Sequence, residues 1–197
     1  GGSTPPGPVG IFLQRGRGQG IFLALFFCAG LREAAAGIAG VSMRNADMDA
    51  LLAALAGIFA GEGREAALRS AALLQGAMGG DLWAVQGDCG FEAGLFATAS
   101  APGAHPAAAL VAAAQPCLPW GTNPADGRMT PEAAAATASA TLLGPGDPIR
   151  CEDLLVGLFW QRPGSYYALH NHDADEIYLI LAGGAVWRAG TDKRRRG

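Results

Sequence analysis

Charge and aromatic side chains are both scarce in this sequence of 197 residues, and each shortage excludes a class of protein. Charged residues make up 16% of the chain and aromatic residues 8%, with a net charge of −3 and an isoelectric point near 5.6. This weak acidic balance offers no basic surface for nucleic acid. The apolar run over 21–28 is too short to span a bilayer as a helix. We therefore expect neither a nucleic-acid partner nor a membrane partner.

Closely paired cysteines are absent as well. The four cysteines, Cys28, Cys89, Cys117 and Cys151, are widely spaced and form no CxxC pair. Such spacing indicates free thiols in a reducing compartment rather than a disulfide framework, and it favours a cytoplasmic location. Secretion is the lesser alternative. Two arginines precede the apolar run over 21–28, as in a signal peptide, but the bulky residues before Cys28 make a poor cleavage site.

Glycine and proline are abundant by contrast, with 30 glycines and 12 prolines, which indicates many turns. The length suits one domain with a helical extension. We divide the chain into a poorly ordered or hydrophobic lead over 1–30, a mainly helical region over 31–129, and a β-region over 130–197. The apolar run over 21–28 is expected to belong to a disordered lead or to form a buried first helix.

Apolar residues recur at helical spacing in the first half of the chain. From Met48 to Phe59 they form one stripe, at the i, i+3, i+4 and i+7 positions that face a core. Helices are expected over 45–60, 64–78, 81–85 and 106–115, and another helix is expected to start at Thr130. His105 precedes Pro106 and is expected to be a solvated loop residue.

The second half has the spacing of β-strands joined by turns. Strands are expected over 137–143, 154–160, 166–170, 176–181 and 185–188. The basic run over 193–196 is expected to be a solvated tail. Together these elements predict an α+β fold, with a helical N-terminal segment followed by a β-domain.

Four chemically active side chains fall within nine residues of the β-region. His170 and His172 are two apart, so on a strand both leave the same face. Glu176 and Tyr178 are also two apart, and Asn171–Asp175 between the pairs is prone to turn. A hairpin would therefore bring the four together. Imidazole nitrogens and a carboxylate suit a divalent zinc, iron or manganese ion, so the sequence predicts a metal site.

The spacing of this segment also carries a family resemblance. Gly164, five residues, His170-x-His172, three residues, Glu176, six residues and Gly183 resemble the first motif of the cupin superfamily. Tyr167, the run HxHxxxEIY and the run GxAxW that begins at Gly183 narrow the resemblance to the cupin-type dimethylsulfoniopropionate lyases, over about residues 45–190. The resemblance implies that the β-domain is a partial cupin β-barrel, or jelly-roll.

The resemblance also implies an activity and roles for residues. A lyase of this kind is a carbon–sulfur lyase that uses a divalent metal to split dimethylsulfoniopropionate into dimethylsulfide and acrylate. By matching positions, His170, His172 and Glu176 are metal ligands, Tyr178 is the base, and Tyr167 helps to hold the substrate. Aromatic rings attract a sulfonium cation, which makes Trp160 and Trp187 candidate substrate contacts; core packing is the alternative for both.

Two other functions share these ligands. One is a different metal-dependent cupin enzyme, such as a dioxygenase or an isomerase, which would not need Tyr178. The other is a non-catalytic cupin sensor that binds a small molecule. A lyase needs a base beside the metal, so the role of Tyr178 distinguishes it from both.

The second cupin motif is missing from the sequence, since no histidine follows His172. Two explanations are open. A C-terminal truncation, which we favour, would leave an open half-barrel that is poorly stable and inactive by itself. In the other, a partner chain, as in a homodimer, supplies the missing strands.

Overall fold

The computed structural model describes residues 20–27, 46–80, 90, 92–121, 130–167, 175–189 and 191–196. Helices dominate the first half of the described chain. They are α1 (Ala46–Glu62), α2 (Glu65–Gly76), α3 (Glu92–Ala99) and α4 (Pro106–Ala114). A short 3₁₀ helix, η1 (Gln115–Cys117), follows α4, and α5 (Pro131–Ala134) is a single turn capped by Thr130. None of the helices in these ranges has the length and apolarity needed to cross a bilayer.

Strands of the second half form a six-stranded sheet together with one strand from near the N-terminus. Its order is β2-β3-β5-β1-β6, with β4 beside β3. The members are β1 (Gly20–Phe27), β2 (Trp120–Gly121), β3 (Thr137–Gly144), β4 (Ile149–Arg150), β5 (Leu155–Gln161) and β6 (Asp175–Gly183). A separate hairpin joins β7 (Ala185–Ala189) to β8 (Asp192–Arg196).

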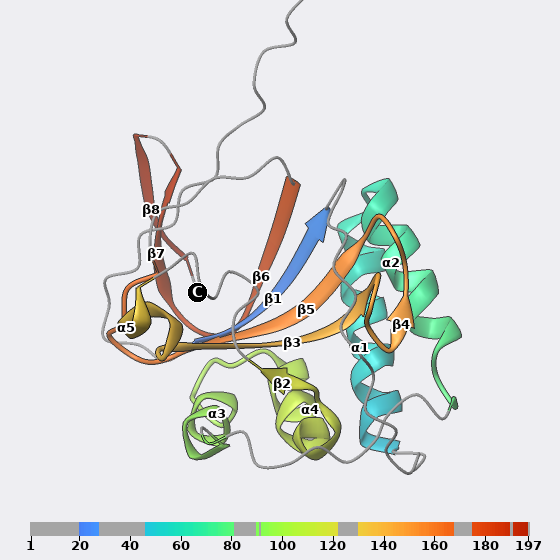
Figure 1. Ribbon diagram of the computed structural model, residues 1–197, viewed down its shortest axis with the longest axis horizontal. Coiled ribbons are helices and arrows are strands. Elements are labelled where there is room, and N and C mark those ends of the chain that lie inside the picture. Colours follow the sequence, from blue (N-terminus) through green and yellow to red (C-terminus); the bar gives the residue numbers. More distant parts are fainter. Residues whose placement is uncertain are drawn as a thin grey trace, which may run out of the picture.

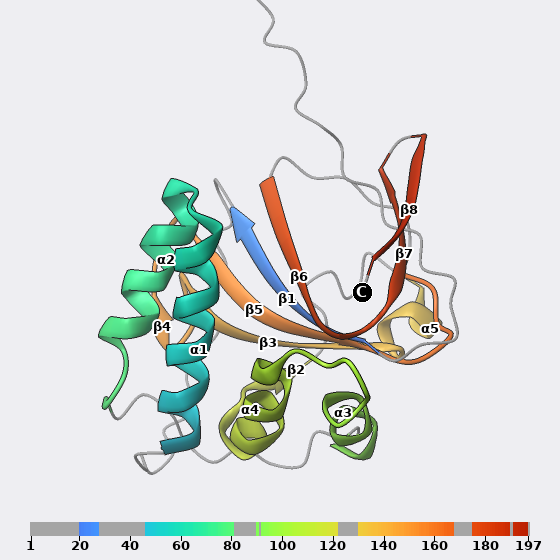
Figure 2. The ribbon, with the colours of Figure 1, turned by 180° about the vertical axis from the view of Figure 1, so that it is seen from behind.

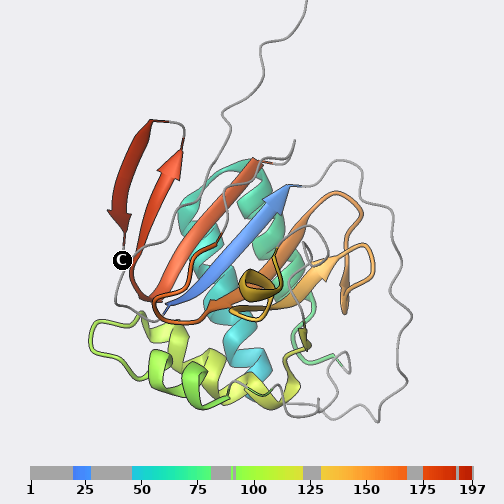
Figure 3. The same ribbon diagram turned by 60° about the vertical axis from the view of Figure 1, so that its left-hand side comes forward.

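The sheet is strongly curved, and the hairpin rises as a wall at its β6 end (Figure 1 and Figure 3). The helices α1, α2, α3 and α4 lie against the outer, convex side (Figure 2). The inner side, called the concave face here, is bounded by the hairpin. The α+β class expected from the sequence is confirmed. The described strands form open sheets and do not close into a barrel.

β1 occupies a central position in the sheet, which differs from the expectation for the apolar run over 21–28. It pairs antiparallel with β5 on one side and with β6 on the other. Neither a disordered lead nor a buried helix forms over these eight residues. The run holds one isoleucine and three phenylalanines, which favour strands, and it is shorter than most core helices. Length and composition therefore favour the strand that the structure shows.

The helical core follows the predicted apolar stripe. Met48, Leu51, Leu52 and Leu55 of α1 are fully buried, and Leu74 of α2 packs in the same core. The expected helix over 81–85 lies outside the described residues. The helix α3 was not predicted, because its eight residues hold no long apolar stripe.

Alternate residues of β3 and β5 complete this core from the sheet. Ala138, Ala140 and Leu142 of β3 are buried on the helix side. Leu158 and Trp160 of β5 join them. The strands expected over 137–143 and 154–160 are thereby confirmed, and the core lies between the convex face of the sheet and the helices.

Two expectations for the C-terminal part need correction. The basic run over 193–196 is not a free tail but belongs to β8, which pairs with β7. Lys193 and Arg194 are exposed to solvent, as expected. Its register places Arg194 opposite Trp187. Tyr166 and Tyr167 are not in a strand, and the rest of the strand expected over 166–170 lies outside the described residues. Pairing with β7 satisfies the backbone of β8 despite its charge, because cross-strand hydrogen bonds do not depend on the side chain.

Candidate active site on the concave face

β6 carries the site, and its two faces have different partners. Ile177 and Leu179 pack against the helix-side core. Tyr178 and Ile180 face the other way and join a smaller cluster on the concave face. The alternation along a strand places Glu176 on the same face as Tyr178. This is the arrangement that the two-residue spacing predicts.

Tyr178 and Glu176 interact directly. Burial raises the pKa of the Tyr178 phenol well above its ordinary value of 10.0. Electrostatic interactions with Glu176 and Tyr167, and a hydrogen bond between the phenol and Glu176, raise this pKa further. One carboxylate oxygen of Glu176 is fully buried. The site thus holds a neutral phenol donor beside a buried carboxylate.

Aromatic rings surround this pair. The rings of Tyr178 and Trp187 have centroids 5.0 Å apart and are tilted by 54°. Those of Phe159 and Tyr167 are 5.2 Å apart and tilted by 59°. Both pairs are tilted, with centroid distances in the range that aromatic rings favour. We call Phe159, Tyr167, Tyr178 and Trp187 the aromatic cluster; Ile180 and Ala185 pack with it.

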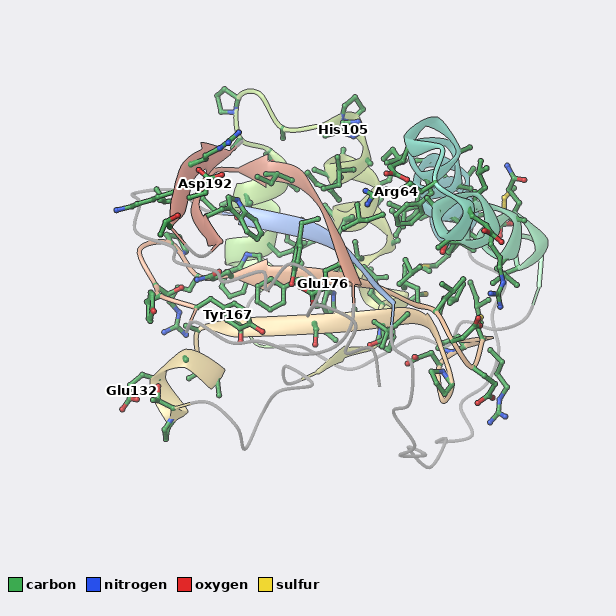
Figure 4. The ribbon with its side chains drawn as sticks, turned by 90° about the horizontal axis from the view of Figure 1, so that it is seen from above. Arg64, His105, Glu132, Tyr167, Glu176 and Asp192 are labelled. Carbon is green, nitrogen blue, oxygen red and sulfur yellow. The ribbon has the colours of Figure 1, made fainter. Side chains whose placement is uncertain are left out.

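The view onto the concave face shows how central these residues are. Tyr167 and Glu176 lie near each other over the middle of the sheet, whereas His105, Glu132 and Asp192 lie at its periphery (Figure 4). Tyr167 follows β5 and Glu176 is the second residue of β6, so residues from two separate segments meet there.

Small residues form the floor beside Tyr178. The register pairs Tyr178 with Ala24 of β1, Ala24 with Gly157 of β5, and Gly157 with Thr141 of β3. Cross-strand partners share a face, so Thr141 shares the concave face with this row. Thr141 was not singled out from the sequence. Thr141 could have been found only from the register of the strands, which a single sequence does not reveal.

The other predicted site residues are distributed as follows. His170 and His172 lie outside the described residues. Trp187 is in the aromatic cluster, but Trp160 lies on the opposite face, 5% exposed within the helix-side core. Trp160 is therefore corrected from a candidate substrate contact to a core residue. It alternates with Phe159, which takes the concave face instead.

The described site fits part of a metal centre. Within the described ranges, no group of three His, Cys, Asp or Glu side chains is close enough to hold an ion. The Glu176 carboxyl group, which hydrogen-bonds the Tyr178 phenol and has one fully buried oxygen, could contribute one ligand. Oxygen donors of this kind suit a divalent first-row cation, and histidine ligands would complete the set.

Glycines with a left-handed backbone conformation stand at both ends of the predicted motif. Gly164 and Gly183 have positive φ values of 71° and 76°, a left-handed conformation that glycine adopts without strain. Gly183 lets the chain turn from β6 into β7, which brings Trp187 back to Tyr178. The two glycines that frame the predicted motif thus have a backbone role.

Comparisons with known proteins give a family match and one partial relative. A family model described as dimethylsulfoniopropionate lyase matches residues 90–196, which include all of β2 to β8. The chain is 43% identical over 44 residues to the dimethylsulfoniopropionate lyase DddQ of Ruegeria pomeroyi. That alignment spans 22% of this chain and 22% of the length of the relative. No solved structure matches the chain significantly.

Proposed function

The chain belongs to the dimethylsulfoniopropionate lyase family, and on that premise we propose that it eliminates dimethylsulfide from dimethylsulfoniopropionate to leave acrylate. The observation that carries the proposal is the Tyr178–Glu176 pair on the concave face, inside an aromatic cluster. The reaction makes the chain a carbon–sulfur lyase. The curved sheet, with its helices outside and its site inside, supports a partial cupin barrel as the fold.

Tyr178 is the proposed base. Its phenolate takes a proton from the carbon next to the substrate carboxylate. The electrons of that C–H bond form the C=C bond of acrylate, and the C–S electron pair leaves on sulfur as neutral dimethylsulfide. The proton remains on the Tyr178 oxygen until it passes to water. Charge balances because the sulfonium loses its positive charge as the phenolate loses its negative one.

The high pKa of Tyr178 sets the main requirement for this step. A phenol hydrogen-bonded to a carboxylate stays protonated near neutral pH, so the protein alone does not supply the phenolate. A divalent iron, manganese or zinc ion held by Glu176 with His170 and His172 would stabilise both the phenolate and the negative charge that develops on the substrate carboxylate. Glu176 would then serve as a ligand in place of a hydrogen-bond acceptor.

Tyr167 is the proposed substrate contact. It lies on the concave face, packs against Phe159, and helps to raise the pKa of Tyr178. An aromatic face at this point attracts a sulfonium by cation–π interaction. The register places a row of small residues, Ala24, Gly157 and Thr141, in line with Tyr178 across the sheet. These features favour a short, zwitterionic substrate.

Headspace gas chromatography tests the proposal. The protein is incubated with dimethylsulfoniopropionate and Mn²⁺, Fe²⁺ or Zn²⁺ in turn, and dimethylsulfide is measured. We expect release with at least one metal, and Tyr178→Phe should lower the rate about 10²- to 10⁴-fold, the usual worth of a general base. Tyr166→Phe, on an exposed neighbour, is the matched control.

Other outcomes have defined meanings. Because a truncated chain is expected to be inactive by itself, the test uses a full-length version. If no metal supports release there, the lyase proposal is wrong. Retention of a metal by that inactive protein would favour a different metal-dependent cupin enzyme or a small-molecule sensor. Full activity in Tyr178→Phe would overturn the role of the base and leave the metal site standing.

A further inference from the structure

Trp187 is one of the described side chains through which the β7–β8 hairpin contacts the sheet. Among the described strands, β7 pairs with β8 and with no strand of the six-stranded sheet. The hairpin is fixed to the sheet by packing: Ala185 is buried with Phe159, and Trp187 packs in the same cluster. The wall that bounds the concave face is therefore held by the residues of the site itself.

Trp187 is turned toward Tyr178. The ring centroids are 5.0 Å apart, and the indole nitrogen of Trp187 is fully buried. A ring tilted by 54° against the phenol limits the directions in which the Tyr178 side chain can swing. Across the sheet, the register places the small residue Ala24 of β1 opposite Tyr178. Glu176 hydrogen-bonds the phenol, and Trp187 supplies a ring that packs on it.

From these contacts we infer that Trp187 is a positioning residue, which holds the Tyr178 phenol in the orientation that the elimination needs. This inference rests on the proposed function and changes the role expected for Trp187 from the sequence. Its ring supports the base, and contact with the sulfonium is left to Tyr167. A base displaced by about 1 Å can lose roughly 10²-fold in rate, so a supporting ring matters for turnover.

The kinetic test separates positioning from substrate contact. Trp187→Leu should lower kcat by about 10- to 100-fold while KM changes less than about twofold. Trp187→Phe keeps an aromatic ring and should recover most of the lost kcat. Trp160→Phe is the matched control, because this tryptophan is buried on the opposite face; it should leave kcat near the wild-type value. A large rise in KM with unchanged kcat would overturn the inference.

A second measurement needs no substrate. The melting temperatures of Trp187→Leu, Tyr178→Leu and the double variant form a cycle that reports the coupling of the two rings. We expect the double variant to lose less than the sum of the single losses. Additive losses would overturn the inference whether or not the protein is a lyase. Coupled losses in a protein that releases no dimethylsulfide would leave the Trp187–Tyr178 contact in place and reject the proposed function alone.

Discussion

The backbone N–H of His105 donates a 2.6 Å hydrogen bond to the carbonyl of Leu181 in β6. Leu181 lies at a bulge, because β1 pairs with Ile180 and then with Ala182 and leaves Leu181 without a Cα partner. His105 is also the N-cap of α4, and its Nδ1 accepts a hydrogen bond from the backbone N–H of Ala107 at 3.1 Å. The start of a helix and the strand that carries the site are thus joined at one residue. His105 is exposed, as predicted, but it is an N-cap rather than a loop residue without a structural role.

Removal of the His105 cap should destabilise the protein. His105→Ala loses the acceptor for the Ala107 N–H, and we expect the free energy of unfolding to fall by about 0.5–2 kcal/mol. His105→Asn, a strong N-cap, is the control and should retain stability. Urea unfolding of the three proteins provides the measurement. Equal stability in His105→Ala and wild type would show that the cap contributes nothing.

Two helical glycines should respond in opposite ways to alanine. A Cβ added at Gly94 of α3 would lie 2.9 Å from Cζ2 of Trp160, so Gly94→Ala overpacks the core and should cost about 1–3 kcal/mol. Gly57 of α1 has no atom within 4 Å of an added Cβ. Gly57→Ala should therefore stabilise the protein by about 0.5–1 kcal/mol, through helix propensity. Thermal unfolding of both variants provides the measurement. Stabilisation by Gly94→Ala would contradict the packing of α3 on Trp160, and destabilisation by Gly57→Ala would contradict the open space at Gly57.

The Arg69–Asp153 pair should make the stability of the protein depend on pH in the acidic range. The two guanidinium N–H groups of Arg69 donate to Asp153 at 2.6 Å, and this holds the Asp153 pKa at about 2, below its ordinary value of 3.8. A lowered folded-state pKa stabilises the protein above the ordinary value, and that contribution is lost as pH falls toward about 2. Asp153→Asn should thus have a lower urea midpoint than wild type near pH 7. The difference should shrink to nothing near about pH 2, and it should be small throughout because both side chains are half exposed.

Tyr178 should make the stability of the folded protein depend on pH in the alkaline range. Its folded-state pKa is raised by burial and by Glu176, so the unfolded chain ionises first. The contribution to stability is complete below about pH 10 and is lost as pH rises above it. In the metal-free protein, Tyr178→Phe should remove part of the alkaline loss seen between about pH 9 and pH 11. Urea midpoints across this range, with Tyr166→Phe as the exposed control, test the sign; a steeper loss in Tyr178→Phe would contradict it.

Local patterns in the sequence were sufficient where one face of an element meets the core. The stripe from Met48 to Phe59 specified α1, and the alternation in β6 specified which residues face the helices. Thr130 predicted the start of α5 through its cap. These features depend on residues close together in the chain, either the period of a helix or strand or a cap at its start. A single sequence is therefore enough to predict them.

Long-range pairing accounts for most of what the sequence did not reveal. Nothing local distinguishes the apolar run of β1 as a central strand, because its partners β5 and β6 lie far along the chain. The face taken by Trp160 depended on the register of β5. In the candidate site the residue types of Glu176 and Tyr178 were sufficient, but the packing of Trp187 on Tyr178 followed from the turn at Gly183.

The central place of β1 has a consequence for how the molecule folds. In the described sheet, β6 reaches the other strands through β1 alone, since β5 and β6 do not pair with each other. The strand β1 is synthesised early, but its partners β5 and β6 belong to the last third of the chain. It therefore stays unpaired until that part of the chain has been synthesised. Such non-local closure is slow and leaves time for aggregation. A chaperone that binds residues 20–27 would hold the nascent chain at the point where the site strand is later added.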